Sequence, residues 1–180
     1  MGGLMKNIVL IGFMGTGKTS TGKVLAQRLG KAFIDLDSRI EETYGETIPQ
    51  MFATKGESYF RQCEKEMVKK VSQRSNAIIS TGGGTIKDAE NVAALRERGI
   101  IVCLTARPEV ILERTERKGE RPVLDGAEAG DRLQAIRDLL AEREKYYGQA
   151  DLAIDTSESS PLQVVERIVH ALKSRGEIHG

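Results

Sequence analysis

Short runs of apolar residues, rich in Ile and Val, recur along the chain and are bounded by Gly, Asn or Asp. Runs of this length and composition are typical of buried β-strands. We expect strands over residues 6–12, 32–37, 76–84, 99–105 and 151–156. Strands that are apolar throughout are buried on both faces, so the pattern favours a parallel sheet with helices on each side, a three-layer α/β fold.

Between these runs lie longer segments in which the apolar residues fall at helical spacing. Helices are therefore expected over residues 18–30, 56–75 and 88–99. Gly30 and Gly99 stand where two of these segments end, and glycine commonly terminates helices. The alternation of strand and helix supports the parallel arrangement, because parallel neighbours need a crossover connection.

Two stretches do not fit simple connections between a strand and a helix. Residues from about 38 to 62 form a long insertion after the second expected strand. Residues from about 116 to 128 are polar and charged and contain Gly and Pro, which favours a mobile lid over a packed element. The remaining segments, 6–37, 76–115 and 129–175, are expected to form the core of a single domain.

The composition disfavours several classes of protein. With 180 residues, a formal net charge of +1, no Trp and 4% aromatic residues, the chain lacks the signature of a nucleic-acid surface. Its apolar runs are shorter than the roughly 20 residues of a membrane helix, and the first run is too short for a secretory signal. Cys63 and Cys103 lie far apart without metal-ligand spacing. We therefore expect a reduced, cytoplasmic protein that binds neither nucleic acid nor membrane.

The segment GFMGTGKT, residues 12–19, fits the G-x-x-x-x-G-K-[ST] pattern and stands between an expected strand and an expected helix. Glycines let backbone N–H groups converge on phosphate oxygens, and a helix N-terminus favours negative charge. Lys18 is placed to reach the β- and γ-phosphates, and the Thr19 hydroxyl is a candidate Mg²⁺ ligand. A dinucleotide site is disfavoured, because Ser20 replaces the third glycine of G-x-G-x-x-G. The nucleotide-binding residues expected here are Gly15, Thr16, Gly17, Lys18, Thr19 and Ser20.

A phosphate-binding loop alone leaves switch GTPases, motor-type ATPases and small-molecule kinases open. The sequence has no N-K-x-D for guanine recognition, no D-x-x-G for a switch loop and no apolar strand that ends in Asp-Glu. A chain of 180 residues also has little room for the additional parts of a motor. These absences favour a small-molecule kinase.

Two carboxylates are candidates for binding the metal and the phosphate acceptor. Asp35 and Asp37 are two positions apart at the end of an expected strand, so we expect both side chains on one side of it, beside the phosphate-binding loop. Mg²⁺ can keep Asp35 ionised, and Asp37 can accept a hydrogen bond from an acceptor hydroxyl. The plain alternative is a solvated strand end.

Arginines and a second glycine cluster complete the candidate set. Arg61 can present a planar fork to a carboxylate, and Arg121 and Arg143 are further candidates. An isolated arginine in a charged segment is, however, more often a surface residue. The glycine cluster at residues 82–84 either brings the backbone close to a ligand or only turns the chain.

Together these segments resemble the shikimate kinase family. The motifs that carry the resemblance are the phosphate-binding loop, FIDLDSRIEE, MFATKGESYFRQCE, STGGGT, RPVL and REKYY, in the order and at about the spacing of the family. They extend from about residue 6 to residue 172. The resemblance implies a P-loop NTPase fold with a five-stranded parallel sheet, similar to nucleoside monophosphate kinases. It also implies transfer of the γ-phosphoryl group of ATP to the 3-hydroxyl of shikimate, in chorismate and aromatic amino-acid biosynthesis.

The resemblance implies roles on the nucleotide side. Lys18 and Thr19 would serve ATP and Mg²⁺, Asp35 would assist Mg²⁺, and Ser80 would hold a Mg²⁺-bound water. Arg114 matches a residue that lies beside the adenine, together with the loop near residues 155–161.

On the acceptor side, the resemblance matches shikimate contacts to Asp37, Arg61, Gly83 and Arg143, and Gly82 and Gly84 are expected to share them. The insertion would cover the acceptor. Arg121 matches the lid arginine that reaches the ATP phosphates. The expected catalytic residues are Asp37, Lys18 and Arg121.

Two alternatives stay open at this point. One is a related kinase for another small acceptor, such as a nucleoside monophosphate or gluconate, which is also a hydroxylated carboxylic acid. The other is a non-catalytic nucleotide-binding module, which would bind ATP without acceptor-dependent turnover. We expect a monomer that binds ATP, Mg²⁺ and shikimate.

Overall fold

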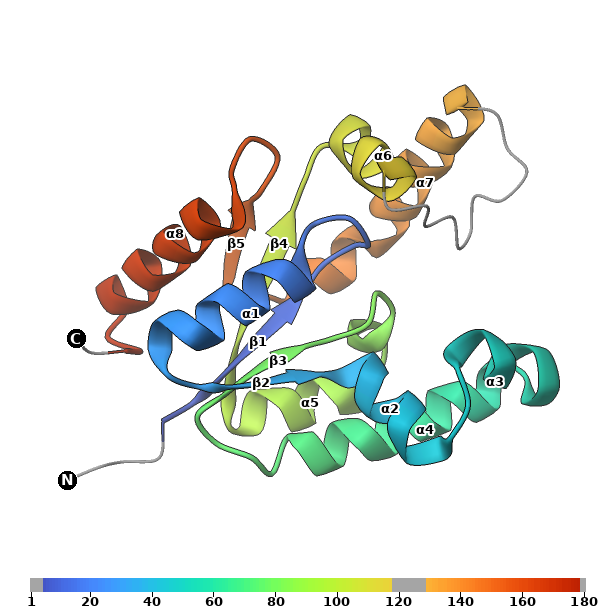
Figure 1. The fold of residues 1–180 in the computed structure, drawn as a ribbon, viewed down its shortest axis with the longest axis horizontal. Helices are drawn as coiled ribbons and strands as arrows, with labels where there is room; N and C mark the ends of the chain where they lie inside the picture. The colour runs from blue at the N-terminus through green and yellow to red at the C-terminus, as the bar shows by residue number, and fades with distance from the viewer. Residues whose placement is uncertain (1–4, 118–128, 179–180) are drawn as a thin grey trace.

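The computed structural model describes residues 5–117 and 129–178. Its centre is a five-stranded parallel sheet in the order β2-β3-β1-β4-β5 (Figure 1). The strands are β1 (Asn7–Ile11), β2 (Ala32–Asp35), β3 (Ala77–Ser80), β4 (Gly99–Thr105) and β5 (Leu152–Asp155). The expected α/β fold with a five-stranded parallel sheet is therefore confirmed.

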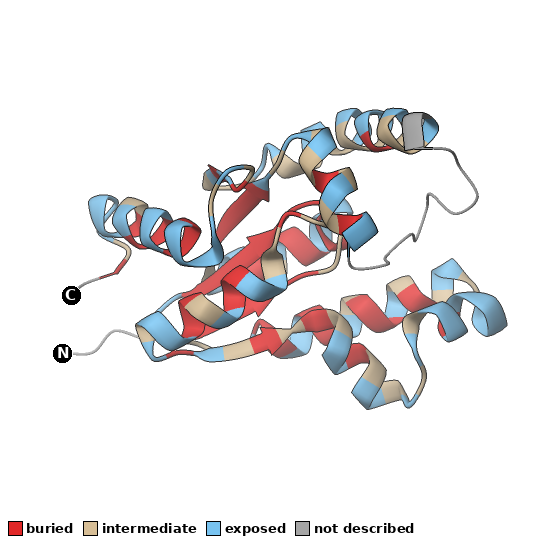
Figure 2. Ribbon diagram, turned by 45° about the horizontal axis from the view of Figure 1, so that its top comes forward, coloured by how far each residue is buried: buried red, intermediate tan, exposed pale blue. Residues whose placement is uncertain are grey.

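Helices cover both faces of this sheet (Figure 1). On one face, α1 (Lys18–Leu29) packs against α8 (Pro161–Ser174). On the other face, α4 (Glu57–Val71) packs against α5 (Ala89–Glu97). Each of these helices presents an apolar stripe to the sheet, and Figure 2 shows buried residues along the strands and on the inner sides of the helices.

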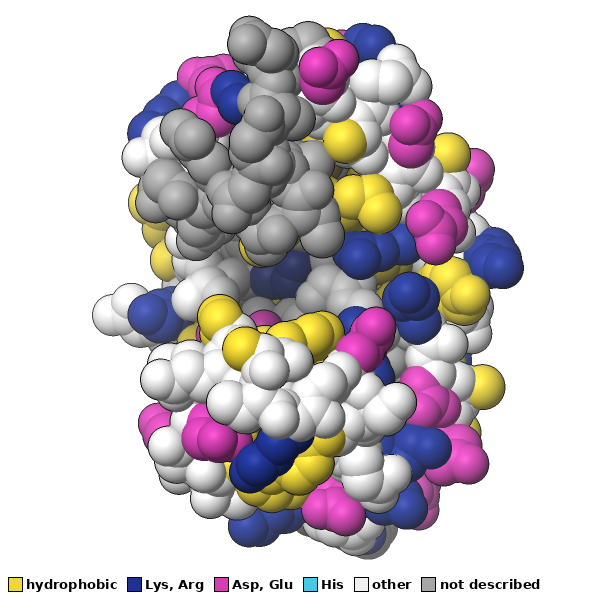
Figure 3. Space-filling model, turned by 90° about the vertical axis from the view of Figure 1, so that its right-hand side faces the viewer, with side chains coloured by type: hydrophobic (Ala, Val, Ile, Leu, Met, Phe, Trp, Pro, Cys, Tyr) yellow, Lys and Arg dark blue, Asp and Glu magenta, His cyan; other side chains and the backbone are white. Residues whose placement is uncertain are grey.

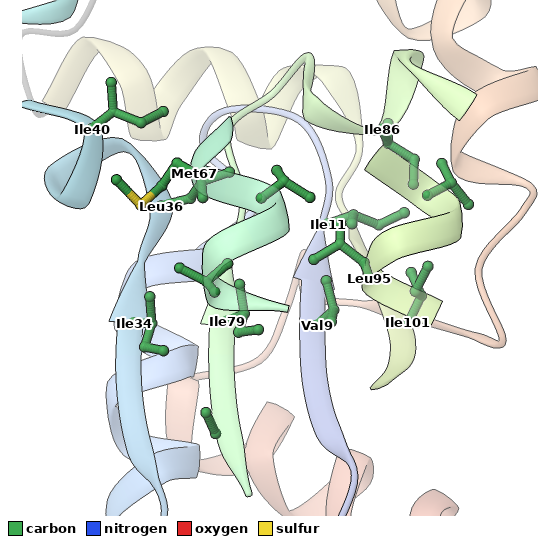
Figure 4. Close-up of a cluster of buried hydrophobic side chains, with 14 of the residues drawn as sticks. Val9, Ile11, Ile34, Leu36, Ile40, Met67, Ile79, Ile86, Leu95 and Ile101 are labelled. Atoms are coloured by element: carbon green, nitrogen blue, oxygen red, sulfur yellow. The ribbon is translucent and has the colours of Figure 1, made fainter. Parts of the chain in front are cut away.

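The central strand β1 is buried on both faces, which explains why its residues from Ile8 to Ile11 are all apolar. Ile8 and Leu10 belong to the apolar cluster under α1 and α8. Val9 and Ile11 belong to the cluster under α4 and α5, where Figure 4 shows them close to Leu95. Alternate side chains of a strand point to opposite faces, so one short run supplies both layers of the core.

Two expected helix ends have different outcomes. Gly30 follows α1 in the left-handed conformation, with φ of 66°, and its N–H donates to the carbonyl of Ala26. Gly99 does not terminate a helix, because Arg98 is the C-cap of α5 and Gly99 is the first residue of β4. A Cβ atom at Gly99 would lie 2.6 Å from the carbonyl oxygen of Leu95. This glycine therefore serves close packing between the helix and the sheet.

The strand expected over residues 32–37 ends earlier, at Asp35. The side chain of Asp35 accepts a hydrogen bond from Ser38 N at 3.1 Å and caps the next helix, α2 (Leu36–Tyr44). Asp37 consequently lies in the first turn of a helix, which corrects the expectation that it continues the strand. Similarly, the strand expected through residue 84 ends at Ser80, because the glycines that follow turn into the 3-10 helix η1 (Thr85–Lys87).

The insertion after β2 is helical. It contains α2 and α3 (Ile48–Lys55) and leads into α4. A capping box begins α3, in which the Thr47 hydroxyl accepts from Gln50 N and the Gln50 side chain accepts from Thr47 N. Met51 of α3 is fully buried against the cluster under α4, so the insertion is anchored to the core.

Two more helices lie beyond the carboxyl end of β4. They are α6 (Pro108–Arg117) and α7 (Ala129–Tyr147), which pack against each other. Ile111 and Ile136 from these helices form a small cluster with Phe13. Of the lid expected at 116–128, residues 116 and 117 form the end of α6 instead, and residues 118–128 lie outside the described part of the structure.

Within residues 5–117 and 129–178, no helix combines the length and apolarity that crossing a bilayer would require.

The buried face of α8 provides a test of this packing. Ile168, on the side of α8 that faces the sheet, is 0% exposed, whereas Leu162 on the same helix is 68% exposed. We predict that Ile168→Ala lowers the free energy of unfolding by about 2–5 kcal/mol, since it leaves a cavity. Leu162→Ala, the matched control, should change it by less than about 0.5 kcal/mol. Equal effects of the two substitutions in urea denaturation would contradict the packing of α8.

Candidate active site

The phosphate-binding loop lies between the carboxyl end of β1 and the first turn of α1. Three of its glycines have φ angles in the left-handed region, at 146° for Gly12, 81° for Gly15 and 90° for Gly17. A side chain at these positions would be strained, so the loop conformation requires glycine. The loop places the N-terminus of α1 at the bottom of a cleft, where free backbone N–H groups favour an anion.

Lys18 lies over this loop. Its Nζ donates to the carbonyl oxygens of Gly12, at 2.6 Å, and Phe13, at 3.1 Å. Burial lowers the pKa of Lys18 to about 8, although the charge of Asp37 opposes the shift. A phosphate group beside this ammonium would favour its charged form, so the position suits the binding of a phosphorylated ligand.

The cleft extends from the phosphate-binding loop to the insertion and has a volume of about 420 Å³. Figure 3 shows it as a hollow across one face of the molecule, with Lys and Arg side chains on its wall. The carboxyl ends of β1, β2 and β3 point toward it, as expected for a ligand site in a parallel α/β sheet. The sequence-predicted residues that line the cleft are Gly15, Gly17, Lys18, Thr19, Ser20, Asp35, Asp37, Arg61, Ser80, Gly82, Gly83, Gly84 and Arg143.

Asp35 and Asp37 both line the cleft but have different environments. Asp35 caps α2 through one carboxylate oxygen, and its Oδ2 lies 3.4 Å from the hydroxyl oxygen of Thr19. Burial raises the pKa of Asp37 to about 6. The charges of Asp35 and Glu64 add to the shift, and the charge of Lys18 opposes it. A carboxylate with a raised pKa suits contact with a hydroxyl group whose proton it can accept.

The oxygen atoms near Thr19 suit a Mg²⁺ ion. Besides the Thr19–Asp35 pair, Ser80 lies beside Asp35 across the β2–β3 pairing and also lines the cleft. Among the described residues, no group of three acidic, His or Cys side chains is arranged to hold a metal. The hydroxyl of Thr19 and the carboxylate of Asp35 nevertheless fit Mg²⁺, which commonly uses one or two protein oxygens and takes its other ligands from phosphates and water.

Arg61 is held from one side by a buried glutamate. Its Nη1 lies 2.9 Å from Glu64 Oε1, one helical turn further along α4, and the Glu64 side chain is only 2% exposed. The other oxygen of Glu64 accepts from the Thr85 hydroxyl at 2.9 Å. That hydroxyl in turn accepts from Gly82 N at 3.1 Å. A buried carboxylate therefore joins Arg61 to the loop that follows β3.

Sequence reasoning named Arg61 without Glu64 or Thr85. The sequence could have indicated the Arg61–Glu64 pair, because residues three positions apart on a helix are neighbours. The contact of Glu64 with Thr85 joins two elements far apart in sequence, and no local pattern reports it.

Arg143 enters the cleft from α7. Its Nη1 lies 3.4 Å from the carbonyl oxygen of Gly83, which also accepts from the Tyr147 hydroxyl at 3.2 Å. The guanidinium lies over the ring of Phe13, with 5.2 Å between its Cζ and the ring centroid. Arg61 and Arg143 thus reach one glycine loop from two different helices, which suits recognition of an anionic group.

Arg114, also expected at the nucleotide, does not line the cleft; it contacts the phosphate-binding loop from α6 and connects three segments. Its Nη1 donates to the carbonyl oxygen of Gly15 at 3.1 Å and to the Thr156 hydroxyl at 3.0 Å, and its Nη2 donates to the Thr156 carbonyl. Burial lowers the pKa of Arg114. Thr16, also expected at the nucleotide, is buried and donates through its hydroxyl to the carbonyl of Phe13. Arg121 lies outside the described residues.

These groups form two halves of one site. A phosphate cradle with an ammonium group and two candidate metal ligands lies on one side. A carboxylate, two guanidinium groups and a glycine loop lie on the other. Such a site can bring the terminal phosphate of a nucleotide to a hydroxyl group of a small anionic acceptor.

Comparison with known proteins agrees with this geometry. The family model described as "Shikimate kinase" matches residues 14–173. A shikimate kinase of Pelotomaculum thermopropionicum is 48% identical over 174 residues, which cover 97% of this chain and 99% of that protein. A shikimate kinase of Caldanaerobacter subterraneus subsp. tengcongensis is 44% identical over 96% of this chain and 99% of its own length.

Solved structures give the same result. A shikimate kinase from Acinetobacter baumannii, determined in complex with shikimate, superposes with a TM-score of 0.87 at 37% identity and covers 95% of this chain and 94% of that one. The shikimate kinase of Aquifex aeolicus superposes with a TM-score of 0.79 at 36% identity, over 94% of this chain and 98% of that one. Sequence and structure agree over nearly the whole length, and the chain therefore belongs to the shikimate kinase family.

Proposed function

We propose that this protein transfers the γ-phosphoryl group of ATP to the 3-hydroxyl of shikimate, giving shikimate 3-phosphate and ADP for chorismate and aromatic amino-acid biosynthesis. The observation that carries the proposal is that a phosphate cradle and an acceptor set with one carboxylate and two guanidinium groups line the same cleft. Membership of the shikimate kinase family and the shikimate-bound relative from Acinetobacter baumannii support the choice of acceptor.

On the nucleotide side, backbone N–H groups of residues 15–20 bind the phosphates, and Lys18 contacts the β- and γ-phosphates. Thr19 and Asp35 would hold a Mg²⁺ ion and Ser80 a water bound to it, and the ion would supply charge neutralisation at the phosphates. Arg114 lies beside the adenine. Arg121, from the lid, would add positive charge at the transferred group.

On the acceptor side, Arg61 and Arg143 neutralise the carboxylate of shikimate, and the backbone of residues 82–84 approaches its ring. Asp37 accepts a hydrogen bond from the attacking hydroxyl, orients it toward the γ-phosphorus and takes its proton late in the transfer. Positioning and charge stabilisation supply most of the acceleration, because the phosphoryl group needs little covalent assistance.

In this proposal the single domain has three functional parts. The core at 6–37, 76–115 and 129–175 carries the nucleotide site, the insertion at about 38–62 covers the acceptor, and the lid at about 116–128 excludes water. The cytoplasmic location and the monomeric state stay predictions.

The choice of acceptor can be tested directly. We predict that release of ADP from MgATP is strongly stimulated by shikimate and stays near its acceptor-free level with gluconate or nucleoside monophosphates, which lack the matching arrangement of carboxylate and hydroxyls. A coupled assay with each acceptor in turn measures this. Stimulation by gluconate alone would indicate a related kinase, and ATP binding without any stimulation would indicate a nucleotide-binding module.

The role of Asp37 can be tested by Asp37→Asn. We predict that kcat falls by about 10²–10⁴-fold, since the amide cannot accept the proton, while the affinity for ATP is retained. The raised pKa of Asp37 means that its charge opposes folding above pH 6, so the neutral amide should not lower the unfolding midpoint at pH 7. Asp131→Asn, on the exposed start of α7, is the control. Unchanged kcat would reject the assigned role.

A further inference from the structure

The two glycine clusters of this protein differ in why they contain glycine. In the phosphate-binding loop, the φ angles of Gly12, Gly15 and Gly17 lie in the left-handed region and exclude other residues. Gly82, Gly83 and Gly84 have no such angles, and φ of Gly84 is −107°. An ordinary residue could therefore adopt the backbone conformation of the second cluster, and its glycines need another explanation.

The space beside the second cluster provides that explanation, because functional side chains occupy it. A Cβ atom at Gly82 would lie 2.8 Å from Asp37 Oδ1. At Gly84, it would lie 2.7 and 2.9 Å from the two terminal nitrogens of Arg61. At Gly83, the distance to Arg143 Nη1 would be 3.2 Å. Each glycine leaves room for the charged end of a different side chain of the cleft.

The same loop is tied to Arg61 by hydrogen bonds. The hydroxyl of Thr85, which is fully buried, donates to Glu64 and accepts from Gly82 N. Glu64 contacts Nη1 of Arg61, and the same guanidinium occupies the space beside Gly84. The Asn91 side chain donates to the Thr85 carbonyl at 3.1 Å and holds the end of the loop in place.

We infer that the segment from Gly82 to Thr85 is a template that sets the positions of the acceptor-binding side chains. Gly82 and Gly84 act as positioning residues by leaving the space that Asp37 and Arg61 occupy, and Thr85 fixes the distance between this loop and Glu64. The inference rests on the proposed function for the roles of Asp37 and Arg61. It adds that recognition of the acceptor depends on the absence of side chains at two positions.

With this arrangement, a substitution at Gly82 or Gly84 should affect binding of the acceptor more than it affects folding. The atoms that would meet a new Cβ at Gly82 or Gly84 are the ends of side chains and not backbone, so they can shift while the backbone keeps its course. Such a shift would remove them from the geometry that binds the acceptor. A methyl group at these positions should therefore impair the site while the protein stays folded.

We predict that Gly84→Ala raises KM for shikimate roughly tenfold to hundredfold, the effect of losing a hydrogen bond to a charged group. KM for ATP should stay unchanged. The control is Gly148→Ala, at an exposed glycine near the end of α7 whose φ is also outside the left-handed region. The thermal unfolding midpoints of the two variants should be similar. Gly82→Ala should instead lower kcat, since it displaces Asp37.

A double-mutant cycle tests whether the effect passes through Arg61. Arg61→Ala should itself raise KM for shikimate and spare ATP. In that background, Gly84→Ala should cause little further loss, because the displaced group is absent. An equal loss in both backgrounds, or an unchanged KM for shikimate in Gly84→Ala, would overturn the inference.

A crystal structure of Gly84→Ala provides a readout that does not depend on turnover. The guanidinium of Arg61 should have moved away from residue 84, and an unmoved Arg61 would also overturn the inference. If the wild-type protein shows no turnover with shikimate, the proposed function fails, while the movement of Arg61 still decides whether this loop acts as a template.

Discussion

The parallel sheet is buried on both faces, and this constraint decides where the protein can place polar groups. Alternate residues of β1 fill the two apolar clusters, so polar side chains along the strand would lie in the core. The carboxyl ends of the strands are free of this restriction. The phosphate-binding loop, Asp35 and Ser80 each follow or end one of three adjacent strands, and the cleft forms where those strands stop.

Charge burial gives this cleft its chemical character. Lys18 has a lowered pKa and Asp37 a raised one, and desolvation is the main cause of both shifts. Each group is therefore poorly compensated by the protein alone. A nucleotide phosphate beside Lys18 and a hydroxyl beside Asp37 would supply the missing partners. The arginines have partners within the protein, since Glu64 contacts Arg61 and the Gly83 carbonyl lies near Arg143. These contacts hold both guanidinium groups in place before an acceptor binds.

Much of this architecture can be predicted from local sequence patterns. The five strands, α1 with its glycine end, and the phosphate-binding loop depend on periodicity and on residue types within short windows. The end of β2 could not be predicted in this way, because the capping hydrogen bond of Asp35 competes with continuation of the strand. The helices α2 and α3 in the insertion are short, and Met51 anchors them through a contact with distant residues.

The site also combines features that local sequence patterns predict with features that depend on contacts between distant segments. The residue types and their order in the sequence suffice to nominate most of the residues that line the cleft. The connection from Glu64 through Thr85 to Gly82 depends on three elements meeting in space, so it required the structure. The prediction that the glycine triplet gives room to the acceptor ring stays a prediction. The structure adds that the same glycines give room to Asp37 and Arg61.

We propose that one cleft brings a nucleotide phosphate to a hydroxyl of shikimate. Phosphorus NMR of a mixture of the protein, MgATP and shikimate tests this most directly, because it identifies the product. We predict a phosphomonoester signal that is coupled to the proton on carbon 3 of shikimate and grows in equal amount to ADP. Formation of ADP with inorganic phosphate alone, or a phosphate on another hydroxyl, would contradict it.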